Sequence, residues 1–275
     1  MPDQFGTRPL FVSTFGTGWP MLCLHGIEAH GVRFLGLAQR LERVQVVAPD
    51  LRGHGRSPME GPWTIDQHVR DLLPLLESLG PRTVVLGHSY GGLIAWELAR
   101  RAADRISGLV LVDPAIAVGA ELARISMEQF SVIDRHWADE SVALRELSVG
   151  RPASALWSVA LDVAVSLKRD ADGSLRPMLA PRAPRARWAQ MQEQLRPSEW
   201  HGPTLLLEAG RENGLYVSPQ VVTAMRAGLA DSLDHVVIDA GHAIPSDHPE
   251  LLAQHVGAFV AALSPTRRRL DATRS

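Results

Sequence analysis

The chain has 275 residues, of which 45% are hydrophobic, and a formal net charge of −2 at pH 7. This length allows one large α/β domain, or a core with an inserted subdomain, and disfavours two unrelated domains. The nearly balanced charge gives no electrostatic reason to expect nucleic acid or an anionic membrane as a partner, so we expect a small-molecule ligand. Cys23 is the single cysteine, which excludes an intramolecular disulfide.

The N-terminus carries no basic stretch followed by an apolar run, as a secretory signal would. No window of the sequence approaches the roughly 18 uninterrupted apolar residues of a membrane span. We therefore expect a cytoplasmic protein that is not inserted in a membrane.

Two short strands are expected at the start of the chain. Residues 8–15 alternate in polarity, and Gly16-Thr17-Gly18 forms a turn before the apolar run Pro20–Leu24. Together they predict an antiparallel hairpin. In His25-Gly26-Ile27 the glycine lets the backbone turn sharply at the end of the second strand, so that the N–H of Ile27 can face inward.

The next segments alternate between helix and strand. We expect an amphipathic helix over residues 34–43, a buried strand over residues 44–48 and a polar, glycine-rich loop over residues 50–57. This loop lacks the Gly-Lys-Ser/Thr ending of a phosphate-binding P-loop, so nucleotide binding is not expected. A capping box, Thr64 with Gln67, and an apolar face predict a helix up to Leu79.

A strand, turn and helix at residues 83–101 carry the most specific motif. The apolar run Thr83–Leu86 leads into Gly87-His88-Ser89-Tyr90-Gly91, and residues with helical spacing follow. A serine at the tip of so tight a turn is held in strained backbone with its hydroxyl exposed, and any Cβ at the flanking glycines would collide with neighbouring chain. Ser89 is therefore the candidate nucleophile. The N–H of Tyr90, at the start of the helix, points to where an oxyanion would form.

The alternation breaks after a strand at residues 108–112, which ends in Asp113-Pro114. Residues 115–201 contain helix-like stretches and no strong strand pattern, and we interpret them as an inserted helical cap. Large apolar side chains in this segment can form a lid over a cleft. Alternatively, they only pack the cap onto the sheet. Candidates for the lining of a substrate pocket are His25, Trp137, Trp157 and Trp188.

The alternation then resumes to the end of the chain. We expect a strand over residues 203–207, a helix over 219–229, a strand over 235–238 and a closing helix over 249–263. The strands are nearly uninterrupted in Val and Leu, which predicts a mostly parallel sheet with helices on both faces. We assign residues 1–114 and 202–264 to the core and expect residues 265–275 to form a flexible tail.

This order of motifs resembles the α/β-hydrolase superfamily over essentially the whole chain. The resemblance rests on the His25-Gly26 loop, the Gly-x-Ser-x-Gly elbow and Gly241-His242 after the last strand. It implies an α/β-hydrolase core with an inserted cap, Ser89 as nucleophile, His242 as general base, and the N–H groups of Tyr90 and Ile27 as the oxyanion hole. Chemistry asks for the same arrangement, because a serine hydroxyl attacks a carbonyl only if an adjacent base takes its proton. His88 is a rival base by proximity, but a base must reach Ser89 from across the cleft.

The acid of the triad departs from the family's pattern. Most members place an aspartate where Gly210-Arg211-Glu212-Asn213 offers asparagine, and an amide cannot supply the charge that stabilises an imidazolium. Asp113, at the end of the strand after the elbow, is one replacement, and some family members supply the acid from that site. Glu212, one methylene longer than aspartate, is the other.

These observations predict a serine hydrolase that cleaves a small, largely apolar carboxylic ester through an acyl-enzyme on Ser89. We expect no cofactor and no metal. Alternatives are the hydrolysis of another acyl bond, such as a lactone, amide or carbon–carbon bond, and a ligand-binding protein with little turnover. Neither the substrate nor the oligomeric state follows from the sequence.

Overall fold

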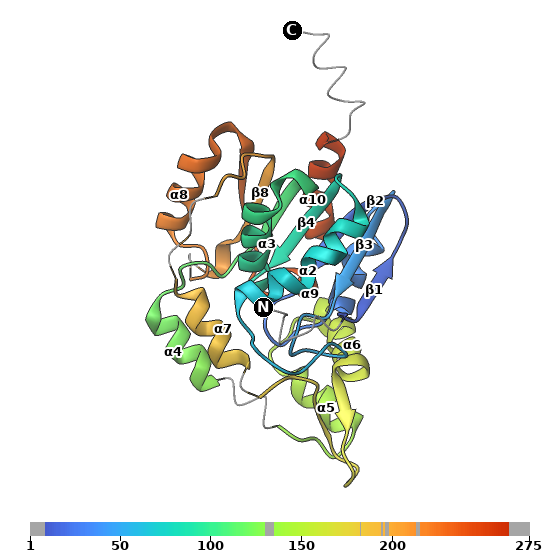
Figure 1. Cartoon of the computed structure of the whole chain (residues 1–275). Helices are drawn as coiled ribbons and strands as arrows, with labels where there is room; N and C mark the ends of the chain where they lie inside the picture. Colours follow the sequence, from blue (N-terminus) through green and yellow to red (C-terminus); the bar gives the residue numbers. More distant parts are fainter. Residues whose placement is uncertain are drawn as a thin grey trace, which may run out of the picture.

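A seven-stranded sheet with the strand order β1-β3-β2-β4-β5-β8-β9 organises the fold (Figure 1). This computed structural model describes residues 9–129, 135–181, 183–193, 195, 198–212 and 215–263, without the side chains of residues 127–129, 183–185 and 212. Neighbouring strands are parallel except for β1 against β3, which confirms the predicted mostly parallel sheet. The strands of this sheet are β1 (Val12–Phe15), β2 (Trp19–Leu24), β3 (Val44–Pro49), β4 (Thr83–His88), β5 (Ile106–Val112), β8 (Thr204–Ala209) and β9 (Leu233–Ile238).

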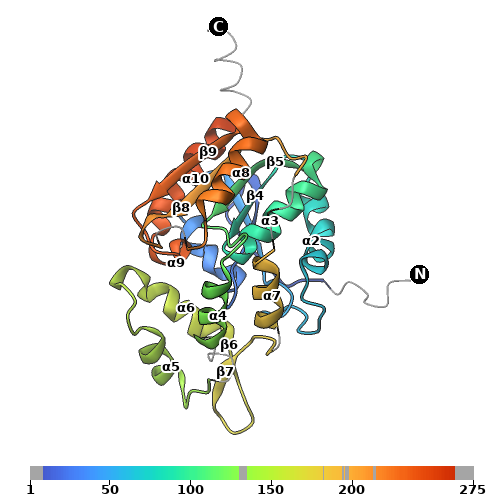
Figure 2. The same ribbon diagram turned by 90° about the vertical axis from the view of Figure 1, so that its left-hand side faces the viewer.

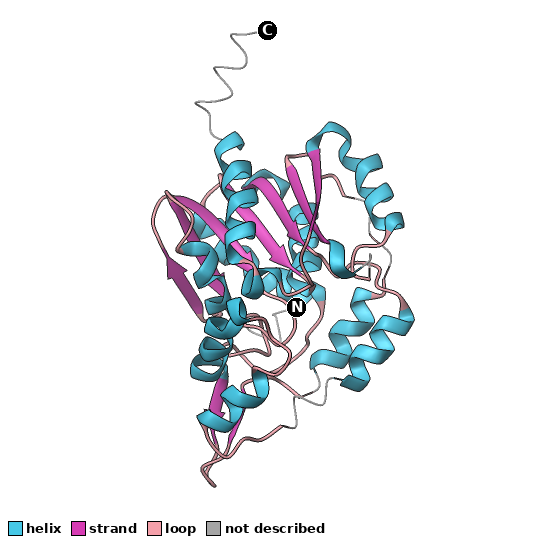
Figure 3. Cartoon of the chain, turned by 180° about the vertical axis from the view of Figure 1, so that it is seen from behind, coloured by secondary structure: helices cyan, strands magenta, loops and turns pink. Residues whose placement is uncertain are grey.

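Helices cover both faces of the sheet, as predicted (Figures 1 and 3). One face packs against α2 (Ile65–Leu79), α3 (Tyr90–Arg101) and α8 (Pro219–Leu229), and the other against α1 (Leu35–Ala38) and α10 (Pro249–Leu263). Successive strand residues supply the two cores alternately: Val85 faces the first set of helices, and Val84 faces the second. In the described part of the chain, no helix is both long and apolar enough to cross a bilayer. The remaining short elements are η1 (Gly31–Phe34), η2 (Ala103–Arg105), η5 (Gly210–Glu212), η6 (Ala230–Ser232) and α9 (Ile244–Asp247).

The predicted hairpin of the first two strands is wrong, because β3 lies between them. Val12 of β1 pairs with Pro49 of β3, and Trp19 of β2 pairs with Val44 of β3. Since β3 is buried on both faces, it takes a place inside the sheet, with partners on both sides. Gly18 allows the connection to cross the start of β3: its φ is 122°, and a Cβ there would lie 2.1 Å from the carbonyl oxygen of Arg43.

The helix expected over residues 34–43 is shorter than predicted. It consists of η1 and α1 and ends at Ala38, and Arg43 then turns with a φ of 57° into β3. In contrast, α2 begins as its capping box predicts, since the Thr64 hydroxyl accepts a hydrogen bond from the N–H of Gln67 at 3.2 Å.

The segment between β5 and β8 lies at one end of the sheet (Figures 1 and 2). It is mostly helical, but it also contains a short antiparallel pair of strands that the sequence did not predict. The division into a core of residues 1–114 and 202–264 and a cap of residues 115–201 stays a prediction, and the tail 265–275 lies outside the described residues. The elements of the segment between β5 and β8 are α4 (Ala120–Gln129), α5 (Glu140–Leu147), η4 (Ala153–Ala155), α6 (Leu156–Ser166), β6 (Leu167–Arg169), β7 (Leu175–Pro177) and α7 (Ala183–Met191).

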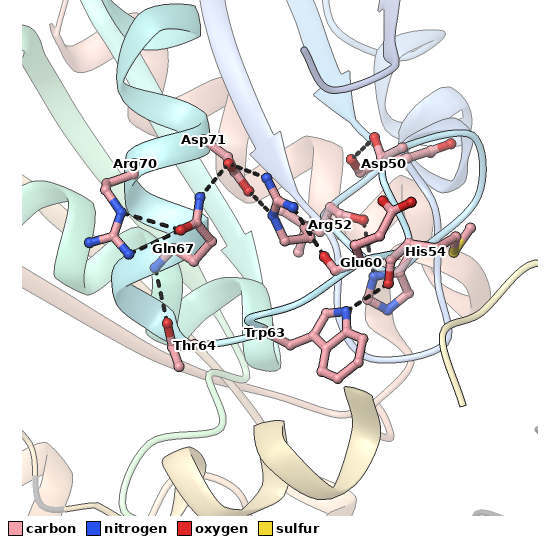
Figure 4. A network of polar contacts seen from close by, with 12 residues as sticks. Asp50, Arg52, His54, Glu60, Trp63, Thr64, Gln67, Arg70 and Asp71 are labelled. Atoms are coloured by element: carbon pink, nitrogen blue, oxygen red, sulfur yellow. Dashed lines mark hydrogen bonds and ion pairs between the residues drawn. The ribbon is translucent and has the colours of Figure 1, made fainter. Parts of the chain in front are cut away.

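A buried ion pair holds the glycine-rich loop after β3 against α2 (Figure 4). The Arg52 guanidinium donates to both carboxylate oxygens of Asp71, at 2.6 and 2.8 Å, and to the carbonyl oxygen of Glu60 at 3.0 Å. Gln67 adds a hydrogen bond to the same carboxylate at 2.9 Å. Arg52 therefore fixes the loop against α2 through the carboxylate of Asp71.

Candidate active site

Ser89 sits in the strained turn between β4 and α3. Its φ of 55° and ψ of −121° are unfavourable for a residue with a side chain. The neighbouring chain is too close to admit anything larger than glycine beside it: a Cβ on Gly91 would lie 2.2 Å from the carbonyl oxygen of Leu24. This tight packing holds the serine in place, as the motif predicts.

A hydrogen-bonded chain joins three residues that are far apart in the sequence. The Ser89 hydroxyl lies 2.9 Å from Nε2 of His242, and Nδ1–H of His242 donates to Oδ2 of Asp113 at 2.6 Å. His242 lies in the loop between β9 and α9, and Asp113 directly follows β5. The backbone N–H of Ala209 donates to the other oxygen of Asp113 at 3.0 Å, which fixes this buried carboxylate.

Of the two candidate acids, Asp113 is the one found against His242. The side chain of Glu212 and all of Asn213 lie outside the described residues.

Two further residues position His242, and neither was expected from the sequence to contact it. Nε2–H of His88 donates to the carbonyl oxygen of His242 at 2.7 Å. Burial lowers the pKa of His88, so its ring is neutral and holds the loop that carries His242. The ring of Tyr216 stacks on that of His242, with 3.6 Å between the centroids and 12° between the planes. Both contacts join distant segments, and no local pattern marks them.

The loop that carries Ile27 approaches Ser89 closely. A Cβ on Gly26 would lie 3.0 Å from the Cβ of Ser89 and 3.5 Å from its Oγ, so only glycine fits without displacement. Tyr90 is the first residue of α3, where backbone N–H groups have no partner within the helix. Ile27 and Tyr90 are thus both placed beside the candidate nucleophile, and their role as oxyanion donors stays a prediction.

His25 uses both ring nitrogens within the protein. Nδ1–H donates to the carbonyl oxygen of Gly26 at 2.8 Å, and Nε2 accepts from the N–H of Leu51 at 2.9 Å. Burial lowers the pKa of His25 to about 3, so the ring stays neutral. In this position His25 braces the Ile27 loop against the loop after β3.

The three candidate tryptophans lie in different places. Trp137 lines a cavity of about 250 Å³ that Ile27 and Glu28 also line, and its indole N–H donates to Glu146 at 2.9 Å. Trp188 packs into the core on the α2 and α3 side of the sheet. The ring of Trp157 lies over Gly36 of α1. A role in substrate binding stays a prediction for each of them.

Arg187 of α7 connects the inserted segment to the loops around the site. Its fully buried guanidinium donates to Nε2 of His54 at 3.1 Å and to the carbonyl oxygen of Arg52 at 2.7 Å. Burial lowers the pKa of Arg187 to about 10, so it stays charged at neutral pH. Across the residues that the structure describes, no group of three or more His, Cys, Asp or Glu side chains is placed to hold a metal ion.

Comparisons of the sequence and of the fold find similar proteins. A family model described as "alpha/beta hydrolase fold" matches residues 20–249. Lipase LipV of Mycobacterium tuberculosis is 32% identical over 254 residues, which cover 89% of this chain and 95% of that protein. Esterase YbfF of Escherichia coli is 25% identical over 252 residues, which cover 88% and 92%. Among solved structures, E-2-(acetamidomethylene)succinate hydrolase is similar in fold, with a TM-score of 0.80 at 23% identity over 92% of this chain and 95% of that one.

Proposed function

Since the chain belongs to the α/β-hydrolase fold family, we propose that it is a serine hydrolase that cleaves small carboxylic esters through an acyl-enzyme on Ser89. The observation that carries the proposal is the hydrogen-bonded chain from Ser89 through His242 to Asp113. The relatives named as a lipase and an esterase support an ester as the substrate.

Acylation begins with proton transfer from Ser89 to His242. Nε2 of His242 takes the proton as Oγ attacks the ester carbonyl, and the N–H groups of Ile27 and Tyr90 stabilise the negative oxygen of the tetrahedral intermediate. Removing one such donor costs about 3 kcal/mol of transition-state stabilisation in a comparable enzyme. The intermediate collapses as Nε2–H of His242 gives its proton to the leaving alcohol, and the acyl group stays on Ser89.

Deacylation repeats these steps with water. His242 takes a proton from water as its oxygen attacks the acyl carbonyl, and it returns the proton to Ser89 when the acid leaves. Throughout, the Asp113 carboxylate keeps the proton on Nδ1 and stabilises the imidazolium that forms.

Labelling with a fluorophosphonate tests the nucleophile. We expect the wild-type protein to be modified once, at Ser89, and to release p-nitrophenol from p-nitrophenyl esters with a burst followed by steady turnover. Ser89→Ala should lose both properties, whereas Ser78→Ala, which alters an exposed serine of α2, should retain them. Equal labelling of the Ser89→Ala protein would remove the proposed nucleophile. A wild-type protein that gives neither label nor burst would instead be a ligand-binding protein.

A further inference from the structure

A cavity lined by both polar and apolar residues lies beside the loop that carries Ile27. Its volume is about 250 Å³. Ile27 lines this cavity and directly follows Gly26, at whose position a Cβ would lie 3.5 Å from Oγ of Ser89. Ile27 thus connects the wall of this cavity to the loop that lies against Ser89.

Three buried polar atoms of the cavity's lining residues have no hydrogen-bond partner among the described residues. They are Oε1 of Glu28, Nε of Arg33 and Nε of Arg151. A buried polar atom without a partner costs roughly 1–3 kcal/mol, so a ligand that pairs with these atoms gains affinity. The set consists of two N–H donors and one carboxylate oxygen.

The charges around the cavity disfavour an anionic group. Arg33 already pairs with Asp162 at 2.6 Å, and Arg151 pairs with Asp247 at 2.5 Å. Oε1 of Glu28 has no hydrogen-bond partner in the described structure. A carboxylate ligand would therefore meet guanidinium groups that are already neutralised and a further carboxyl group.

A hydroxyl group fits the same atoms. It accepts a hydrogen bond from an arginine N–H and donates one to a carboxylate. Burial raises the pKa of Glu28 to about 7, with the positive charges of Arg135 and Arg33 acting in the opposite direction. Because a hydroxyl can both donate and accept, it pairs with Glu28 in either protonation state. Apolar side chains also line the cavity, such as Leu147 and Leu179, and they suit the carbon atoms that carry the hydroxyl.

We propose that this cavity binds a hydroxyl-bearing arm of the ester and that Glu28 selects that arm by hydrogen bonding. The inference rests on the proposed esterase function and narrows its substrate class to esters with a hydroxylated alcohol or acyl group. Glu28 is thus a specificity-determining residue that takes no part in the bond-breaking steps.

Two matched pairs of esters test this proposal. Propyl butyrate and glycerol 1-monobutyrate differ only in the hydroxyl groups of the alcohol, and ethyl butyrate and ethyl 3-hydroxybutyrate differ only in a hydroxyl of the acyl group. We expect kcat/KM to be at least about tenfold higher for the hydroxylated ester of one pair, since one net hydrogen bond of about 1.4 kcal/mol corresponds to a factor of ten. The pair that shows the preference identifies the arm that enters the cavity.

Variants of Glu28 connect the preference to the cavity. Glu28→Leu should abolish the preference, so that kcat/KM becomes about equal for the two esters of the pair. Glu28→Gln, which keeps an oxygen acceptor, should retain most of the preference. Glu42→Leu, a change at an exposed glutamate outside the cavity, should leave the ratio unaltered. A preference that persists in Glu28→Leu would overturn the role of Glu28. If Glu28→Leu does not fold, Glu28→Gln alone tests the proposal. Loss of the preference for the hydroxylated ester in Glu28→Gln would contradict the proposal that a side-chain oxygen at residue 28 accepts the hydrogen bond.

The outcomes separate this inference from the proposed function. Equal rates within both pairs, in a protein whose Ser89 reacts with a fluorophosphonate, would overturn the cavity proposal and leave the esterase intact. Absence of both turnover and labelling would remove the two together.

Discussion

Asp113 places a carboxylate against the ring of His242, whereas the position at which the family usually has an aspartate is Asn213 in this chain. Its two oxygens have separate partners, because Oδ2 accepts from His242 and Oδ1 accepts from the N–H of Ala209. The second bond comes from the end of β8, the strand beside β5. Two neighbouring strands thus fix the orientation of the carboxylate.

We predict that Asp113→Asn lowers kcat by at least about 10³-fold, because an amide neither stabilises the imidazolium nor selects the required tautomer. Steady-state hydrolysis of a p-nitrophenyl ester measures the loss. Asp239→Asn, which alters an exposed acid near His242 in sequence, should reduce kcat by less than about threefold. The opposite result would be a large loss of kcat in Glu212→Gln and a small one in Asp113→Asn. That result would assign the role of triad acid to Glu212.

For single residues of the candidate site, the sequence predicted those that belong to a motif and did not determine the acid or the residues that contact His242. Ser89 follows from the local Gly-x-Ser-x-Gly pattern, and His242 follows from the place of Gly241-His242 after the last strand together with the family resemblance. The acid did not follow, because Asp113 and Glu212 were both chemically suitable, and the contact between Asp113 and His242 depends on how distant segments pack. Tyr216 has no local signal, because its stacking on His242 depends on how two loops meet.

Among the elements, the loop after β3 and helix α2 behave as one unit through the Arg52–Asp71 pair (Figure 4). Both side chains are almost completely buried, with 6% and 1% of the side-chain surface exposed. A buried pair of this kind contributes little net stability compared with an apolar pair, but the loss of one partner leaves a charge without compensation.

We therefore predict that Asp71→Asn lowers the free energy of unfolding by about 3–5 kcal/mol, as measured by urea denaturation. Asp66→Asn is the matched control on the same helix, because Asp66 pairs with Arg101 at an exposed position. Its effect should stay below about 1 kcal/mol. Equal losses for the two variants would contradict the importance of burial.

Element prediction succeeded where each segment carries its own signals. The bounds of α8 and α10 agree with the expected helices, and the capping residue of α2 is the predicted Thr64. Prediction failed where the pairing between distant segments determines the order of the strands. Nothing in residues 8–24 indicates that β3 separates the first two strands. The position of β3 between them follows from its burial inside the sheet, where it pairs with a strand on each side.

For the molecule as a whole, buried polar contacts join the inserted segment to the sheet and its loops. Asp162 of α6 accepts hydrogen bonds from His30 at 2.9 Å and from Arg33 at 2.6 Å. Burial acts to raise the pKa of Asp162, but Arg33 and His30 outweigh it and hold that pKa below its ordinary value. Such contacts could not be predicted, because they require the positions of the inserted helices relative to the sheet.

The stability of the whole molecule should depend on the protonation of Glu28. Burial raises the pKa of its carboxyl group from 4.5 to about 7, so the folded protein binds this proton more tightly than the unfolded chain does. The contribution is favourable below about pH 4.5 and is lost as the pH rises to about 7, by about 3 kcal/mol in total.

We predict that Glu28→Gln, which cannot ionise, becomes more stable relative to the wild type as the pH rises. The difference in the free energy of unfolding between the two proteins should grow by about 3 kcal/mol between pH 4 and pH 8. Urea denaturation at a series of pH values measures it, and groups common to both proteins cancel. A difference that does not vary with pH would show that Glu28 ionises normally in the folded state.

The placement of the inserted segment between β5 and β8 has a consequence for synthesis. β5 is paired with β4 on one side, but its other neighbour, β8, is encoded only after the whole insertion. While the ribosome makes the intervening residues, the open edge of β5 presents unpaired backbone groups and an apolar run from Leu109 to Val112 to its surroundings. Aggregation of nascent chains should therefore be most severe for chains that stop within the insertion, and a chaperone that shields this edge would act in that interval.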